Sequence, residues 1–410
     1  MQLPEDFVKP NYNGRSIANI PATVAKITDV PFSGLMPLED SLWQHTAQNS
    51  NRVVVLLLDA MGWNLIQKWR KELSFILDRA SVIEPITSVC PSTTTVALTS
   101  FWTGYGAATH GLAGLTQFLS DYAVGTQMIS FTPTFGHYPD ALINAGLDLT
   151  QFLAVPGMAE QLARGDVPTY AYKGREIVDS ALSKMHGRGV VGNHGAITFA
   201  DMLVQIRECL HEHAGEPLYI SGYWPTIDTI SHFRDWSSEA VKSELLSLFH
   251  QIQTLFIDQL SAQAKANTSF FIVADHGQTS RNQERLIRLE DHPQLQSQLL
   301  MKPMGDMRVA YLYTKQGCQE SVIEYVHAHL GHNVLALRRD DALATGIFGP
   351  GPYADDAKDR MGDIVLLMRG QTLFYADAQQ YYIDNFLAGH GGMTQDEMQV
   401  PWIGFDLDAL

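Results

Sequence analysis

Residues 52–59 have the sequence RVVVLLLD, an unbroken run of β-branched residues and leucines that ends in an aspartate. A strand with one solvent-facing side alternates apolar and polar residues, and this run shows no such alternation. We therefore expect Arg52–Leu58 to be a strand that is buried on both faces of a parallel sheet. Asp59 then either caps the next helix or lies in a binding site, because open α/β sheets place their sites past the carboxyl ends of strands.

Short apolar runs of this kind alternate with helical segments from about residue 50 onward. The alternation is typical of an α/β fold with a mostly parallel central sheet and helices on both faces. We expect one domain over residues 1–410, in which residues 1–50 form an N-terminal arm. Residues 112–150 and 278–310 have little periodicity, so we expect irregular loops there that shape a substrate pocket. The other expected strands are 81–89, 218–222, 269–274, 309–313 and 363–368, and the expected helices include 63–73, 93–103, 237–263 and 318–330.

The composition limits the class of protein. The chain has 410 residues, of which 45% are hydrophobic, and this is enough to bury a large core. A net charge of −16 argues against a nucleic-acid polymer or an anionic membrane as partner. The longest apolar runs are too short to span a bilayer, and the first residues lack the apolar segment of a secretory signal, so we expect a cytoplasmic protein. Three dispersed cysteines predict neither disulfides nor a thiolate metal site, and nothing in the sequence indicates an oligomeric state.

Acidic and histidine residues follow several of the expected strands. Asp275 and His276 come directly after the run FFIVA, and Asp228 precedes His232 by four residues, which places both on one face of a helix. His390 lies in the sequence GHGG, which on its own is also an ordinary turn. Together with the first strand's aspartate, these residue types supply the ligands for two divalent metal ions.

A threonine cluster lies between two of these positions, in the sequence PSTTT at residues 91–95. Its structural interpretation is the N-cap and first turn of a helix. A helix N-terminus also favours a phosphate group, because its N–H groups are unpaired. A hydroxyl there needs a metal ion to become a nucleophile, and spacing alone does not distinguish Thr93, Thr94 and Thr95.

The ordered set of motifs resembles the alkaline phosphatase superfamily, and most closely its type I phosphodiesterase/nucleotide pyrophosphatase family. The resemblance extends from about residue 50 to residue 393. It rests on the strand before Asp59, on PSTTT followed by TSFWTGYGAATHG, on D-x-x-x-H at 228–232, on ADHG at 274–277 and on GHGG at 389–392. It implies a hydrolase of small phosphate esters that uses two zinc ions and a covalent phospho-threonine intermediate. The family pattern P-[ST]-x-T aligns the nucleophile with Thr94.

The resemblance also assigns the metal ligands. One metal ion is assigned to Asp228, His232 and His390. The other is assigned to Asp59, Asp275, His276 and the hydroxyl of Thr94. A mixed set of histidines and carboxylates suits zinc best, although manganese is also compatible with it.

The expected reaction is in-line attack of Thr94 on phosphorus, followed by hydrolysis of the phospho-enzyme. One departure from the family concerns residues 96–98, which are Val-Ala-Leu where family members have Pro-Asn-His. The asparagine amide that would hold a phosphate oxygen is therefore missing, which weakens the case for nucleotide diesters. No arginine is close to Thr94 in sequence, which favours a diester over a doubly charged monoester, although Arg308 and Arg360 are candidates to reach the site.

Other interpretations stay open. On the same scaffold, the alternatives are a phosphomonoesterase, a phosphonate hydrolase and a phosphomutase, and outside it a non-catalytic metal-binding protein. A formylglycine sulfatase is excluded, because Thr93 stands where its C-x-P-S-R motif has arginine. The aromatic residues that we consider as stacking surfaces for the substrate are Phe131, Phe135, Tyr138 and Tyr223.

Overall fold

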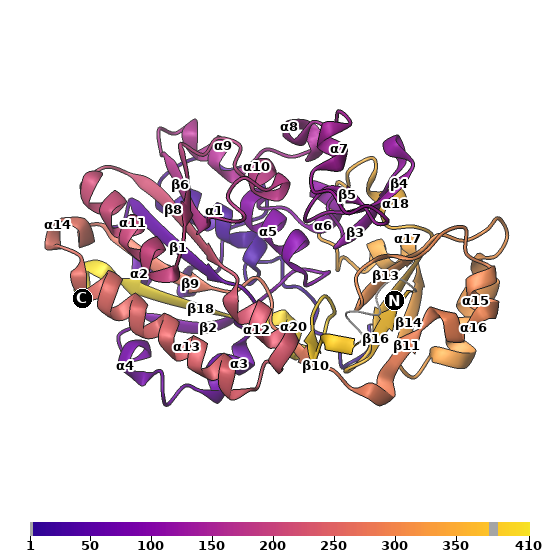
Figure 1. Cartoon of the computed structure of the whole chain (residues 1–410). Coiled ribbons are helices and arrows are strands. Elements are labelled where there is room, and N and C mark those ends of the chain that lie inside the picture. The colour runs from indigo at the N-terminus through magenta and orange to yellow at the C-terminus, as the bar shows by residue number, and fades with distance from the viewer. Residues whose placement is uncertain (1–2, 377–383) are drawn as a thin grey trace.

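The computed structural model describes residues 3–376 and 384–410, which form two seven-stranded sheets side by side (Figure 1). In the first sheet the strand order is β2-β18-β9-β1-β8-β6-β7. The bounds are Val82–Thr87 (β2), Gln399–Asp406 (β18), Thr268–Val273 (β9), Arg52–Leu58 (β1), Leu218–Trp224 (β8), Thr169–Gly174 (β6) and Gly192–Ala196 (β7).

The predicted mostly parallel sheet is confirmed. Strand β1 is parallel to both of its neighbours, β8 and β9, and all seven of its residues are buried. Only β18 runs in the opposite direction, pairing antiparallel with β9 and with β2. An apolar run indicates burial but carries no information on strand direction, so the sequence did not indicate this reversal.

Helices cover both faces of the first sheet, as expected (Figure 1). The longest, α11 (Phe199–Glu212), begins at Thr198, whose hydroxyl accepts a hydrogen bond from the amide of Asp201 and so caps the helix. Its buried residues recur at helical spacing and pack on β6, β7 and β8. Among the described residues, the structure contains no helix with the length and apolarity needed to cross a bilayer.

Two of the expected helices are interrupted. The segment 63–73 forms α3 (Trp63–Lys68) and then turns before α4 (Ser74–Leu77). The segment 237–263 forms α13 (Glu239–Gln251), a π-helical turn at Ile252–Phe256 and a 3-10 turn at Ile257–Gln259. Periodicity in the sequence detects the buried side of such a segment but not a local change of helical pitch.

The second sheet is antiparallel throughout, in the order β14-β15-β13-β12-β3-β4-β5. The bounds are Val334–Arg338 (β14), Ile364–Met368 (β15), Val309–Leu312 (β13), Met304–Gly305 (β12), Thr116–Leu119 (β3), Val124–Gln127 (β4) and Thr132–Pro133 (β5). The prediction that 112–150 and 278–310 are irregular is therefore wrong, because both segments supply strands to this sheet. These strands have two to four residues, too few for an alternating pattern to be recognised.

One hydrophobic cluster contains residues of both sheets, such as Val55 of β1 and Tyr311 of β13. It also includes much of the N-terminal segment, where α1 (Ile20–Ile27) buries all of its residues except Lys26. Helix α1 and the 3-10 turn before it, Ile17–Asn19, pack against α5 (Thr94–Thr103). The shared cluster supports a single structural unit, and one domain over residues 1–410 stays a prediction.

A charged residue at the start of β1 is fully buried. The guanidinium of Arg52 donates to the carbonyl oxygens of Leu210 at 2.6 Å and Ala264 at 2.9 Å, and to the hydroxyl of Thr268 at 3.1 Å. These bonds tie the start of β1 to the end of α11 and to α14 (Ala262–Lys265). The opposite end of β1 leads into the candidate site.

Candidate metal centre

Three strands of the first sheet end at the same edge. In the register, Leu57 of β1 faces Val273 of β9, and Leu58 faces Trp224 of β8. Asp59 directly follows β1, and Asp275 is the second residue after β9. Strand β8 leads into α12 (Thr226–Arg234), whose first turn carries Asp228. Strand register thus gathers three carboxylates that are far apart in sequence.

A first group consists of Asp228, His232 and His390, whose ligand atoms lie within 4.8 Å of one another. Asp228 Oδ1 is 3.4 Å from His232 Nε2 and 3.6 Å from His390 Nε2. The first two residues are four apart on α12, as expected from their spacing. His390 comes from a loop near the other end of the chain.

A second group consists of Asp59, Asp228 and His276, also within 4.8 Å of one another. His276 Nε2 is 3.5 Å from Asp59 Oδ1 and 3.3 Å from Asp275 Oδ2. Asp228 belongs to both groups, whereas the sequence-based assignment used it in only one. The structure therefore brings all six predicted side-chain ligands together, with Asp228 between the two groups.

All three histidines are oriented by the backbone. In each ring Nδ1 lies within hydrogen-bonding distance of a carbonyl oxygen, which only accepts, so Nδ1 carries the proton. The pairs are His232 with Ala388 at 3.0 Å, His276 with Gly277 at 3.1 Å and His390 with Ser92 at 3.1 Å. Nε2 of each ring is left as a lone-pair donor facing the carboxylates, which is the arrangement of metal-binding histidines.

The carboxylates have unsatisfied oxygens. Among the described residues, buried Oδ1 of Asp59 and buried Oδ2 of Asp275 have no hydrogen-bond donor. Unpaired buried carboxylate oxygens are costly, and a hard divalent cation satisfies them. The donor set of carboxylate oxygens and imidazole nitrogens therefore fits divalent metal ions, as the sequence predicted.

The pKa shifts of the three carboxylates also support a bound cation. Burial, together with the charges of Asp275 and Asp228, raises the pKa of Asp59 well above its ordinary value. Burial raises the pKa of Asp275 to about 6. Burial also acts to raise the pKa of Asp228, but the nearby histidines outweigh it and the pKa is lowered overall. A bound dication would reverse the penalty on the first two carboxylates.

Of the three adjacent threonines, Thr94 faces the cluster. It is the first residue of α5, and its Oγ1 lies 3.2 Å from His276 Nε2. The buried hydroxyl of Thr95 donates to the carbonyl of Gly114 at 3.1 Å, and the buried side chain of Thr93 lies beside the carboxyl group of Asp306. Only Thr94 therefore has its hydroxyl directed at the candidate ligands.

This geometry agrees with a comparison against known families. The family model for type I phosphodiesterase / nucleotide pyrophosphatase matches residues 53–393. The chain belongs to this family. Members of the family are phosphoric ester hydrolases, and this chain is one of them. No curated protein sequence matches the chain.

Solved structures show the same fold at low sequence identity. Murine ectonucleotide pyrophosphatase / phosphodiesterase 5 has a TM-score of 0.66 and 17% identity, over 86% of this chain and 88% of that one. The human protein of the same name has a TM-score of 0.62 and 19% identity, over 86% and 87%. Phosphonoacetate hydrolase from Sinorhizobium meliloti 1021, solved with phosphonoformate, has a TM-score of 0.63 and 16% identity, over 87% and 94%. The predicted alkaline-phosphatase-like fold is confirmed.

Two glycines of the family motifs are required by close packing. A Cβ on Gly277, in the ADHG motif, would lie 2.1 Å from the carbonyl oxygen of Asp396. Gly391, after His390, has φ of +116° and would place a Cβ 2.7 Å from the carboxyl group of Asp306. Side chains at either position would displace the loops that carry His276 and His390.

The sequence did not reveal what holds the GHGG loop in place. Arg308 and Glu397 are both fully buried and form a bidentate ion pair, with Nε to Oε1 at 2.8 Å and Nη2 to Oε2 at 2.7 Å. Glu397 also accepts a hydrogen bond from the amide of Gly392 at 2.8 Å. Two residues 89 apart give no local signal, so only the fold shows this pair.

The arginines that we considered as phosphate ligands have other partners. Arg308 is held by Glu397 and by the carbonyl oxygen of Gly370. Arg360 is paired with Asp356 and donates to the carbonyl of Gly111 at 2.7 Å. The suggestion that either arginine reaches the reacting phosphate is therefore wrong.

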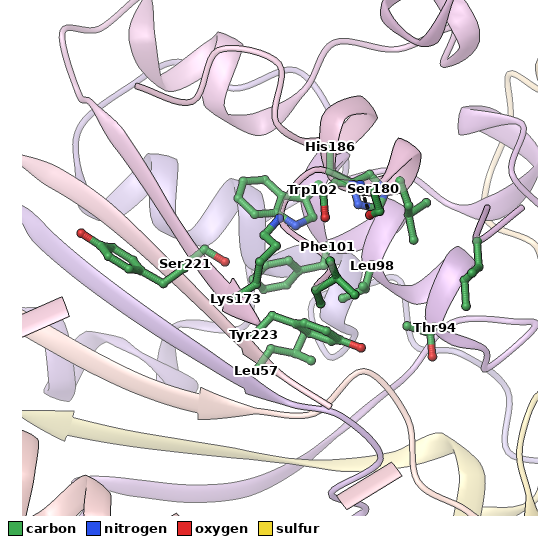
Figure 2. Close-up of a pocket in the computed structure, with 15 residues that line it drawn as sticks. Leu57, Thr94, Leu98, Phe101, Trp102, Lys173, Ser180, His186, Ser221 and Tyr223 are labelled. Atoms are coloured by element: carbon green, nitrogen blue, oxygen red, sulfur yellow. Dashed lines mark hydrogen bonds between the residues drawn. The ribbon is translucent and has the colours of Figure 1, made fainter. Parts of the chain in front are cut away.

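The four candidate stacking residues have different environments. Phe131 is fully buried and packs edge-on against Phe152, so it is a core residue and the suggestion for it is wrong. Phe135 and Tyr138 are exposed to 79% and 82%. Tyr223 lines a cavity next to Thr94 (Figure 2). Its hydroxyl donates to Asp59 Oδ2. Of the four, Tyr223 is the one placed to contact a substrate.

The Arg308–Glu397 pair leads to a first prediction. Glu397→Gln leaves a buried guanidinium without its counter-charge, so we expect the free energy of unfolding to fall by about 3 kcal/mol in urea titrations. Because the GHGG loop loses an anchor, we also expect the affinity for divalent metal ions to fall on the order of tenfold to a hundredfold by calorimetry.

The matched control for this variant is Glu320→Gln, which removes a carboxylate that pairs with Arg338 on the surface. An exposed pair contributes little, so this control should change stability by less than about 1 kcal/mol. Equal effects of the two substitutions on stability and on the affinity for divalent metal ions would contradict the anchoring role of Glu397.

Proposed function

We propose that this chain is a two-metal phosphodiesterase or nucleotide pyrophosphatase that forms a covalent intermediate on Thr94. One observation carries the proposal. The Thr94 hydroxyl lies next to two overlapping groups of buried and partly buried carboxylates and imidazoles, all at one edge of the parallel sheet. A nucleophile beside ligands for two cations is the arrangement that phosphoryl transfer requires.

The residues of the chain position the nucleophile and the phosphoryl group. Thr94 is at the N-terminus of α5, and its N-cap residue, Thr93, makes no side-chain capping bond to the helix. The first amide groups of α5 and the positive end of its dipole therefore face the same space as the Thr94 hydroxyl. They would stabilise negative charge on the phosphoryl oxygens, in part taking the place of the asparagine amide that this chain lacks.

We propose zinc as the metal, with manganese as the alternative. Asp228, His232 and His390 would hold one ion, and Asp59, Asp275 and His276 the other, with Asp228 able to contact both. Two such ions, when bound, lower the pKa of a hydroxyl or a water molecule and stabilise charge on the attacking and leaving oxygens. The Nδ1–carbonyl hydrogen bonds hold each imidazole in the tautomer that this role needs.

The substrate is proposed to be a small phosphodiester. A monoester carries a second negative charge, and both arginines considered for it are engaged elsewhere. A singly charged phosphorus centre is therefore favoured. A phosphomonoesterase or a phosphonate hydrolase remains the alternative on the same scaffold, and the cytoplasmic location stays a prediction from composition.

The nucleophile is tested by Thr94→Ala. We expect turnover of bis(4-nitrophenyl) phosphate to fall on the order of 10³-fold or more, with zinc content unchanged, because the six side-chain ligands remain. Thr94→Ser restores a hydroxyl and should recover turnover, and Thr95→Val should retain it. A phospho-enzyme trapped in acid and located by mass spectrometry on another residue would overturn the assignment.

The metals are tested by removal and replacement. We expect two zinc ions per chain by elemental analysis, and loss of activity after dialysis against a chelator, with recovery on adding zinc. His232→Ala removes a ligand of the first group only, so we expect one bound ion to be retained. A chain that binds no divalent ion at micromolar concentration would rule out the two-metal proposal.

The reaction class is tested by comparing three substrates. We expect kcat/KM for bis(4-nitrophenyl) phosphate to exceed that for 4-nitrophenyl phosphate, because both arginines considered as partners for the monoester's additional charge are engaged elsewhere. Phosphonoacetate serves as the third substrate. Faster turnover of the monoester or of phosphonoacetate would transfer the assignment to the alternative reaction concerned.

A further inference from the structure

A cavity of about 140 Å³ opens beside Thr94 (Figure 2). Its walls come from four elements of the first sheet and its helices, namely α5, β6, β8 and α10 (Ala181–His186), and from the end of β1. Ile129, from the segment 112–150, completes the wall. The cavity is separate from the cluster of metal ligands. Thr94 and Tyr223 line the cavity and also contact residues of that cluster.

One face of α5 connects the cavity to the reacting atom. Thr94, Leu98, Phe101 and Trp102 are spaced by four, three and one residues, so they lie along the same side of the helix. All four line the cavity. A group attached to the phosphorus that Thr94 attacks therefore lies against an apolar, largely aromatic wall.

A single charged side chain lies in this apolar cavity. Lys173, on β6, is 6% exposed, and its ammonium nitrogen is 5.9 Å from the centre of the Trp102 ring. Figure 2 shows its side chain extending along the Trp102 ring in the cavity that contains Thr94. Within the described part of the chain, no carboxylate lies within 4.0 Å of the ammonium and no hydrogen bond to it is formed. The ammonium therefore faces the cavity without a protein partner for its charge, so that charge is available to an anion that enters the cavity.

The neighbouring histidine does not supply the missing negative charge. The hydroxyl of Thr99 donates to the carbonyl of Thr95 at 2.6 Å, so toward His186 Nε2, at 2.9 Å, it acts as the acceptor. The imidazole is therefore protonated on Nε2. Burial and the charge of Lys173 lower the pKa of His186 well below its ordinary value, so the ring is neutral. Burial lowers the pKa of Lys173 to about 8, so the ammonium is the charged group of the cavity at neutral pH.

We propose that this cavity binds the organic group of the substrate, and that Lys173 selects substrates whose organic group ends in a second anion. The proposal rests on the proposed function, because it takes Thr94 as the reacting residue. The substrate class is then a phosphate ester or pyrophosphate with an apolar or flat spacer between the reacting phosphorus and a carboxylate or second phosphate. The spacer packs on Phe101 and Trp102, and the terminal anion pairs with the ammonium.

Binding of non-hydrolysable probes tests this selection independently of turnover. Each ω-carboxyalkylphosphonate is compared by calorimetry with the alkylphosphonate of equal length, in a series of increasing chain length, on the zinc-loaded protein. The matching bisphosphonates distinguish a terminal phosphate from a terminal carboxylate. We expect one chain length at which the second anion improves affinity on the order of tenfold to a hundredfold, as for a hydrogen bond to a charged group in a buried site.

Lys173→Met is the decisive variant, because it keeps the length of the side chain and removes the charge. We expect it to lose the preference for the second anion while it binds the plain alkylphosphonates as well as the unsubstituted protein does. Since the substitution removes an unpaired buried charge, we expect its melting temperature to be equal or higher. Lys184→Met, on the exposed side of α10, is the matched control and should keep the preference.

The two proposals fail in different ways. If the unsubstituted protein shows no preference for the second anion, the role of Lys173 is overturned. The same holds if the preference survives Lys173→Met, whether or not bis(4-nitrophenyl) phosphate is hydrolysed. A Lys173-dependent preference without hydrolysis of any phosphate ester supports the binding site and overturns the proposed reaction. A lower melting temperature for Lys173→Met would also contradict the proposal, because it would show that the ammonium stabilises the fold itself.

Discussion

Mutual repulsion among three closely spaced carboxylates, two of them buried, is the constraint on which the rest of the structure depends. Asp59, Asp228 and Asp275 are gathered by the register of β1, β8 and β9. Burial is the largest cause of the raised pKa values of Asp59 and Asp275, and the charges of neighbouring carboxylates raise them further. Two like charges 4 Å apart at an effective dielectric constant of about 20 repel by about 4 kcal/mol. Only positive charge at the centre of the cluster makes this arrangement stable with all three ionised. The surrounding imidazoles, each fixed through Nδ1, leave room and lone pairs for that charge.

Much of this site could be predicted from the sequence, because its parts are local patterns at strand ends. The run RVVVLLLD showed both the buried strand and its terminal aspartate, and the spacing of Asp228 and His232 showed a shared helix face. The metal-ligand group to which each residue belongs depends on the distances between segments that are far apart in the sequence. Asp228 lies in both groups because α12 enters the centre of the cluster, and no spacing in the sequence contains that information. The same is true of the pairing of Arg308 with Glu397.

The second sheet and the cavity were missed for different physical reasons. Strands of two to four residues, such as β4 and β12, are defined by their partners and not by their own periodicity. Lys173 gave no signal, because a lysine in a strand is ordinarily taken for a residue that reaches solvent. That Lys173 is buried beside α5 and has no carboxylate partner can be seen only in the folded structure. The adjacent threonines were distinguished in the same way, by the bond of Thr95 to Gly114.

Strand β18 has a consequence for how the chain acquires its structure during synthesis. It lies between β9 and β2, so β2 has no neighbour in the sheet until residues 399–406 have left the ribosome. Contacts between residues more than 300 apart close slowly, since loop entropy must be overcome first. Nascent chains would therefore expose the edge of β9 from its own synthesis until that of residues 399–406, a state in which chaperones protect sheet edges from aggregation.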